Sequence, residues 1–150
     1  MMIRARAPLR LGLAGGGTDL SPYCEQFGGA VLNATIDLYA YATLEPIVGD
    51  YVHFIAKDAG FEERDSANPD DLIVGGRAIL HRAVYKAITC RYLGGKAYPC
   101  RLTTFCEAPP GSGLGSSSTM VVAMVKAFVE ALALPLGEYD IARLAFEIER

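Results

Sequence analysis

Hydrophobic and polar residues alternate along the first part of the chain, with the two-residue period of strands that face a core on one side. This alternation predicts strands over Ile3 to Leu13, Val31 to Leu44 and Tyr51 to Lys57. Between the first two, Ser21-Pro22 is typical of a helix start and Gly28-Gly29 of a helix end, so we expect a short helix there.

In the second half the spacing becomes helical. Apolar residues between Gly76 and Leu93 recur every three or four positions, and Gly94-Gly95 follows as a natural helix end. The remaining predicted elements are a strand from Pro99 to Glu107 and helices from Ser116 to Leu132 and from Leu136 onward. The stretch from Asp58 to Asp71 is charged and irregular, and we expect a mobile surface loop there.

Length and composition are those of one folded globular domain, and the periodicity adds that its structure mixes α and β elements. The chain has 150 residues, of which 51% are hydrophobic and 21% charged, enough to bury a core. A net charge of -3 provides no basic stripe, so nucleic acid is not an expected partner. No apolar run is long enough to span a bilayer, and the first residues form no signal-peptide core, so we expect a cytoplasmic protein without membrane partners.

Cysteine and histidine usage points away from a zinc site. The four cysteines have no C-x-x-C spacing, and the chain has only two histidines, so a zinc site is not expected. We expect reduced thiols that pack mostly as small hydrophobic residues.

The strongest chemical signal is a run of glycines and hydroxyl residues directly before the helix predicted from Ser116. It reads Pro109-Pro110-Gly111-Ser112-Gly113-Leu114-Gly115-Ser116-Ser117-Ser118-Thr119. Glycine lets the backbone approach a ligand closely, and the first helical turn offers unpaired N–H groups and the positive end of its dipole. The run therefore predicts a phosphate-binding site. The alternative is a glycine-rich turn followed by a Ser or Thr helix cap.

Familiar phosphate and nucleophile motifs do not fit this run. A Walker A loop needs a lysine, and none occurs before Lys126. The dinucleotide fingerprint needs glycine where Ser116 stands, and a nucleophile elbow needs glycine where Pro110 stands.

Three stretches resemble the GHMP small-molecule kinases. The run at residues 109–119 resembles their phosphate-binding motif, P-x-x-x-G-L-G-S-S-A, except that Ser118 replaces the final alanine. Residues 7–19, which contain Gly-Gly-Gly-Thr-Asp, resemble the first motif of the sugar kinases typified by D-glycero-D-manno-heptose 7-phosphate kinase. Residues 145–150 resemble the helical segment that presents a glutamate to nucleotide-bound magnesium, and the matching residue is Glu149.

The resemblance implies a fold and a domain. It implies an α+β N-terminal domain like domain 2 of ribosomal protein S5, and we expect residues 1–150 to be this ATP-binding domain. Family members are longer, with a C-terminal ferredoxin-like domain and a catalytic-base aspartate just after the Glu149 position. We therefore expect the chain to be an N-terminal portion that lacks both, with an apolar surface that favours homodimerisation or pairing with a C-terminal half.

The implied activity is ATP- and Mg²⁺-dependent phosphorylation of a sugar or sugar phosphate, with the C1 hydroxyl of D-glycero-D-manno-heptose 7-phosphate as the best candidate. The alternative is a nucleotide-binding or assembly fragment without turnover. The two differ in whether the γ-phosphate is transferred.

Site residues follow from the same resemblance. The expected nucleotide cradle comprises Pro110, Gly111, Ser112, Gly113, Leu114, Gly115, Ser116, Ser117 and Ser118, with Ser117 and Glu149 as magnesium ligands. The expected sugar site comprises Gly16, Gly17, Thr18 and Asp19, and Arg10 is the expected catalytic residue near the reacting hydroxyl. The alternatives without a functional role are a turn or helix cap for Asp19, a strand-surface position for Arg10 and a solvated helix face for Glu149.

Other polar residues stay outside the expected site. We expect solvated charges at Arg4, Arg6, Arg77 and Arg82, and half-exposed strand tyrosines at Tyr39, Tyr41 and Tyr51.

Overall fold

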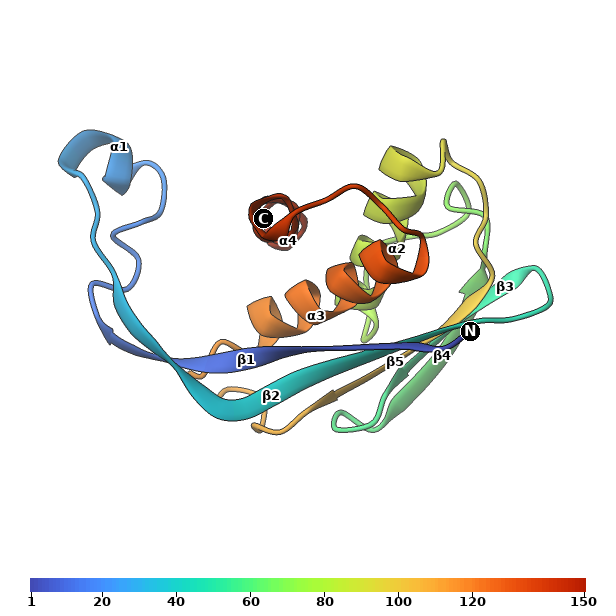
Figure 1. The fold of residues 1–150 in the computed structure, drawn as a ribbon, viewed down its shortest axis with the longest axis horizontal. Helices are drawn as coiled ribbons and strands as arrows, with labels where there is room; N and C mark the ends of the chain where they lie inside the picture. The colour runs from blue at the N-terminus through green and yellow to red at the C-terminus, as the bar shows by residue number, and fades with distance from the viewer.

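One five-stranded sheet forms the base of the computed structural model, which describes residues 1–150 (Figure 1). The strands lie in the order β1-β2-β5-β3-β4. Their bounds are Ile3–Ala14 for β1, Leu32–Pro46 for β2, Tyr51–Ala56 for β3, Phe61–Ser66 for β4 and Cys100–Cys106 for β5. Neighbouring strands are antiparallel except β3 and β5, which run parallel.

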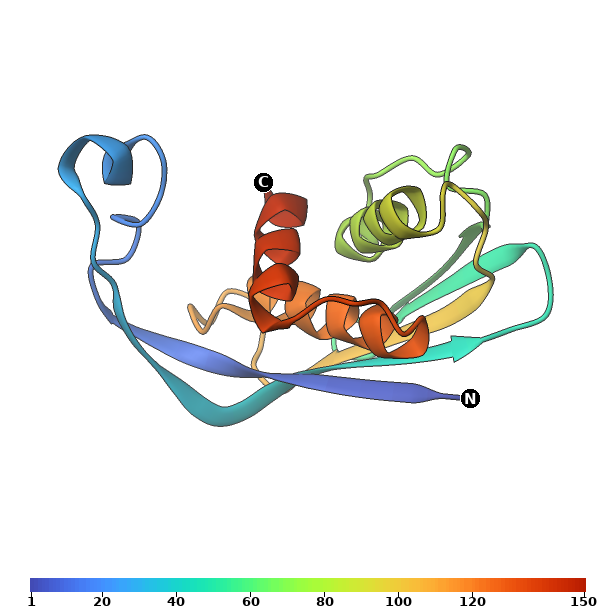
Figure 2. The same cartoon turned by 45° about the horizontal axis from the view of Figure 1, so that its top comes forward.

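All four helices lie on one side of this sheet (Figures 1 and 2). They are α1 (Tyr23–Phe27), α2 (Ile79–Tyr92), α3 (Ser116–Ala131) and α4 (Glu138–Glu149). Helix α3 packs on β1 and β2, and α4 packs on α3 and α2 without lying on the sheet. No helix of the chain combines the length and the apolar character needed to cross a membrane.

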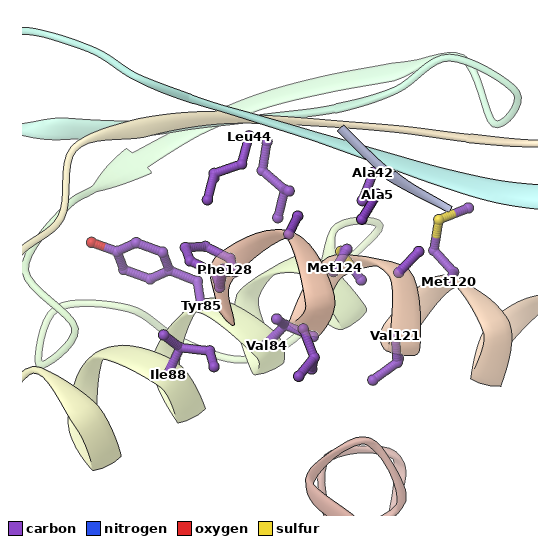
Figure 3. Close-up of a cluster of buried hydrophobic side chains, with 14 of the residues drawn as sticks. Ala5, Ala42, Leu44, Val84, Tyr85, Ile88, Met120, Val121, Met124 and Phe128 are labelled. Atoms are coloured by element: carbon purple, nitrogen blue, oxygen red, sulfur yellow. The ribbon is translucent and has the colours of Figure 1, made fainter. Parts of the chain in front are cut away.

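Small residues on the strands let α3 approach the sheet closely. Ala5 and Ala42 are buried between the sheet and the α3 residues Met120 and Met124 (Figure 3). Phe128 continues the same helix face and contacts the ring of Tyr85 from α2, at a centroid distance of 6.3 Å. Because α3 is buried on nearly all sides, its sequence is apolar around most of its circumference.

The predicted strands and helices are confirmed with small changes at their ends, apart from one segment. The expectation of a mobile loop over residues 58–71 is wrong, because Phe61–Ser66 forms the edge strand β4. The acidic side chains of Glu63 and Asp65 are held there by Arg82 of α2, whose guanidinium donates to both carboxylates. Arg82 is therefore a nearly buried ion-pair partner, and its predicted solvated state is also wrong.

The outer parts of β1 and β2 extend beyond the helices as an arm that carries α1 at its tip (Figure 1, left). The predicted short helix is confirmed, but Ser21 does not cap it. Instead, the Ser21 hydroxyl donates to Glu25 Oε1 at 2.8 Å.

The tyrosines and cysteines largely follow expectation. Tyr39 and Tyr41 are half-buried, with the guanidinium carbons of Arg6 and Arg4 at 4.4 and 4.5 Å from their ring centroids. All four cysteines are free thiols, and burial raises the pKa of Cys100 to about 12. Cys90 is the exposed exception to the expected packing.

Candidate active site

The glycine-rich run leaves β5 and ends at the N-terminus of α3. Gly115 is the residue before the helix, with φ 71° and ψ 33°, and no side chain caps the helix. The first helical N–H groups, from Ser116 to Ser118, therefore have no cap and face the loop. Since this backbone conformation favours glycine, the turn has the form of an anion cradle and differs from a Ser- or Thr-capped helix start.

Strand β1 supports this cradle through Arg10. The Arg10 backbone N–H donates to Leu114 O at 3.1 Å. Its guanidinium lies against Gly115, where an added Cβ would be only 1.7 Å from Nη1. The Leu114 side chain packs against the hydrophobic core and anchors the middle of the run. Arg10 thus contacts the loop directly instead of standing free on the strand surface.

The last residue of α4 meets the first turn of α3. Ser117 Oγ donates to Glu149 Oε1 at 2.8 Å, and Ser118 Oγ donates to Glu149 Oε2 at 2.7 Å. Residues separated by more than thirty positions are therefore brought into contact, and Glu149 is not a freely solvated residue.

A polar hollow of about 600 Å³ opens between the arm and the helix ends. Its lining includes Arg10, Gly16, Gly17, Asp19, Gly113, Gly115, Ser118 and Glu149. The structure therefore gathers residues expected to bind sugar, phosphate and metal around one space. Asp19 and Arg10 supply opposite charges on the same lining.

Thr18 differs from the other residues of the predicted sugar site. It does not line the polar hollow, and its hydroxyl is used inside the arm. Thr18 Oγ1 lies 2.7 Å from Gly15 O and 3.0 Å from Ala30 O, and it accepts the Ala30 N–H at 3.1 Å. Thr18 closes the loop that carries Asp19, so the structure gives it a supporting position.

A second, apolar pocket of about 220 Å³ lies on the other side of the cradle. Pro110, Ser116 and Ser117 contribute from the glycine-rich run, and the remaining lining includes Ala56, Asp58, Phe61, Arg77, His81, Thr104 and Met120. Gly111 and Ser112 line neither space, although the Ser112 N–H closes a turn on Pro109 O at 3.2 Å.

His81 is a polar group within this apolar wall. Its Nε2 lies 2.9 Å from Thr104 Oγ1, and its ring packs edge-on to Phe61 at 5.6 Å. Burial, and then the charge of Arg82, lower the pKa of His81 to about 4. The imidazole is neutral at pH 7 and suits an uncharged ligand group.

Sequence reasoning missed this pocket and the second contact of Glu149. Phe61, His81 and Thr104 come from β4, α2 and β5, and no local motif marks them. The one available sign was Ser118, because it departs from the motif that the glycine-rich run resembles.

The Ser117–Glu149 pair fits a hard divalent cation. A hydroxyl oxygen and a carboxylate oxygen are ligands that Mg²⁺ accepts, and Ser117 Oγ and Glu149 Oε1 lie 2.8 Å apart. No group of three or more His, Cys, Asp and Glu side chains in the chain is placed to hold a metal. Further ligands would come from phosphate oxygens and water, the usual arrangement for Mg²⁺.

Comparisons with known proteins agree with this geometry. Residues 79–150 match the GHMP kinases N terminal domain. The chain is 44% identical to D-glycero-alpha-D-manno-heptose 7-phosphate kinase of Campylobacter jejuni, over 99% of the chain and 43% of that relative.

Two solved structures are similar along the full chain. A D-glycero-D-manno-heptose 1-phosphate kinase from Bacteroides thetaiotaomicron is 48% identical with a TM-score of 0.91, covering 100% of this chain and 48% of that one. A putative sugar kinase from Campylobacter jejuni is 44% identical with a TM-score of 0.85, covering 99% and 47%. The chain thus spans less than half the length of these relatives. Residues 79–150 thus match the N-terminal domain of the GHMP kinases, and the whole chain is similar in sequence and fold to heptose phosphate kinases of about twice its length.

Proposed function

We propose that the chain binds Mg-ATP at the glycine-rich cradle and serves the transfer of its γ-phosphoryl group to a hydroxyl of a sugar phosphate. The observation that carries this proposal is the position of the cradle between two different spaces, with the Ser117–Glu149 pair at the boundary. An apolar pocket suits a nucleotide base, and a polar hollow suits a sugar.

The nucleotide lies with its base in the apolar pocket, beside Phe61 and the neutral His81. Backbone N–H groups of Gly113 through Ser118 then surround its phosphates, as free helix N-termini do for anions. Ser117 and Glu149 would hold a magnesium ion, which would supply charge neutralisation at the phosphates.

The acceptor sugar lies in the polar hollow. Asp19 accepts hydrogen bonds from its hydroxyls, and the side-chain-free Gly16 and Gly17 leave room for the ring. The reacting hydroxyl oxygen bonds to the γ-phosphorus while the bond to the bridging oxygen breaks and ADP departs. Arg10 stabilises the charge on the phosphoryl group in transit. The hydroxyl proton passes to a base, which the family resemblance expects after Glu149.

The proposed acceptor is a D-glycero-D-manno-heptose phosphate, with C1 of the 7-phosphate as the best candidate. The names of the two heptose kinases support this class, and they differ in the carbon that carries the phosphate. Both heptose 7-phosphate and heptose 1-phosphate are therefore the acceptors to test.

Calorimetric titration with Mg-ATP tests the cradle first. The 150-residue chain is expected to bind saturably, and Ser117→Ala is expected to weaken binding and its dependence on magnesium. Ser66→Ala is a matched control, since Ser66 also donates to a carboxylate, Asp71 Oδ2, far from the site. Absence of binding by the folded chain contradicts the proposal.

Phosphorus NMR with each heptose phosphate then tests turnover. A new anomeric phosphate signal from heptose 7-phosphate supports phosphorylation at C1. This test uses a chain extended to the length of the relatives, so that the expected base is present. Saturable nucleotide binding by that longer chain without transfer to either acceptor favours the alternative, a nucleotide-binding module.

A further inference from the structure

Both carboxylate oxygens of Glu149 are occupied, each by a different serine of the same helical turn. Oε1 accepts from Ser117 and Oε2 from Ser118, at 2.8 and 2.7 Å. Two such bonds fix the plane of the carboxylate as well as its position. A single bond would leave the group free to rotate about its last side-chain torsion.

The two serines lie on different sides of the cradle. Ser117 lines the apolar pocket, whereas Ser118 lines the polar hollow together with Glu149. They therefore do not duplicate each other: Ser117 faces the space proposed for the nucleotide, and Ser118 faces the polar hollow that Glu149 also lines.

A cation held by Ser117 and Glu149 would affect the two hydrogen bonds differently. A hydroxyl that coordinates a cation through its oxygen directs its hydrogen away from that cation, so Ser117 would donate less well to Glu149. The Ser118 hydroxyl would remain free to donate to the Glu149 carboxylate.

We propose that Ser118 is a positioning residue that holds Glu149 in the orientation required for binding the divalent cation of the nucleotide. This inference rests on the proposed Mg-nucleotide site and adds a residue to it. Ser118 stands where the resembled motif ends in alanine, which has no hydroxyl to make this contact. The hydroxyl is thus a feature of this chain that the motif does not supply.

A purely structural role is the competing explanation, because the same bond ties α4 to α3. Loss of one outer hydrogen bond to a metal ligand typically costs about 10- to 100-fold in metal affinity. A structural tie would lower thermal stability without changing the affinity of the folded protein for the cation. Metal affinity and stability therefore need to be measured on the same variants.

The test is titration of the chain with Mn²⁺ in the presence of a non-hydrolysable ATP analogue, with free Mn²⁺ followed by electron paramagnetic resonance. Ser118→Ala is expected to weaken Mn²⁺ binding about tenfold, and Ser118→Thr to retain wild-type affinity. Ser66→Ala, which removes a serine–carboxylate bond outside the site, is expected to have no effect. Unchanged Mn²⁺ affinity in folded Ser118→Ala overturns the inference.

If Ser118→Ala does not fold, Ser118→Thr and Ser118→Val provide the comparison, since they share a shape and differ by the hydroxyl. Equal Mn²⁺ affinity of this pair then overturns the inference. Nucleotide binding by the wild-type chain, weakened by Ser117→Ala but not by Ser118→Ala, contradicts the role of Ser118 alone. Failure of the wild-type chain to bind the nucleotide contradicts the proposed function and this inference together.

Discussion

The Arg10 guanidinium occupies the space that any side chain at Gly115 would need. A Cβ at position 115 would lie 1.7 Å from Arg10 Nη1, and the Gly115 backbone has φ 71°. Strand β1 and the phosphate cradle are therefore fitted to each other at one glycine. The arginine proposed to act on the transferred phosphoryl group also shapes the loop that holds it.

Gly115→Ala is expected to damage both stability and nucleotide binding. The left-handed backbone costs a non-glycine residue roughly 1–2 kcal/mol, whereas the flexible end of the Arg10 side chain can move aside at little cost. We expect a nucleotide affinity at least about tenfold lower, a loss of about 1.4 kcal/mol of binding free energy, measured by calorimetry. Gly75→Ala is the control, because a Cβ there meets nothing and φ is not positive. Wild-type affinity in Gly115→Ala contradicts the fit.

Thr18→Val is expected to loosen the arm without touching the cradle. Valine keeps the shape of threonine but loses the bonds to Gly15 and Ala30. Loss of these bonds is expected to cost about 1 kcal/mol of local stability, with nucleotide binding unchanged. Hydrogen exchange over residues 15–30 is expected to accelerate, whereas Thr18→Ser retains protection. Unchanged exchange in Thr18→Val contradicts the supporting role.

His81 is expected to make stability fall as the pH falls from 6.5 towards 4. Its pKa is about 4 in the folded chain and 6.5 when the imidazole is fully solvated, so the unfolded chain binds more protons in this window. Over the whole range from pH 6.5 to pH 4, acidification lowers the free energy of unfolding by about 3 kcal/mol. Urea unfolding at about pH 7 and about pH 4.5 measures it, and His81→Gln is expected to show the shallower pH dependence. Equal pH dependence of the two proteins refutes the assignment.

Arg82→Gln is expected to release β4 from α2. The substitution leaves Glu63 and Asp65 without their cation in a partly buried setting, at a cost of about 1–3 kcal/mol. Faster hydrogen exchange in residues 61–66 measures the local effect. Arg64→Gln, in β4 between Glu63 and Asp65, is the control. It removes only an exposed contact over the Tyr51 ring, worth under about 1 kcal/mol. Equal exchange in the two variants argues against the anchoring role of Arg82.

Local properties of the sequence were sufficient for most elements and for the cradle. The alternation in β1, the helical spacing in α2 and the glycine-rich run each depend on residues close together in the chain. The spacing of apolar residues indicates which side of an element is buried, and glycine indicates where the backbone needs a positive φ. Both can be read without knowing what the element packs against.

Tertiary structure alone decided which distant groups meet. Strand β4 looked like a charged loop because its counter-charge, Arg82, comes from a helix and lies 17 positions beyond Asp65. The apolar pocket draws on three separate elements, and the second bond to Glu149 joins Ser118 to a residue 31 positions away. The sequence by itself determined the individual strands, helices and the glycine-rich loop, because propensity and periodicity act over a few residues. Only the tertiary structure decided which side chains of different elements meet. An ion pair, a pocket wall or a hydrogen bond depends on distance in space and leaves no local pattern in the sequence.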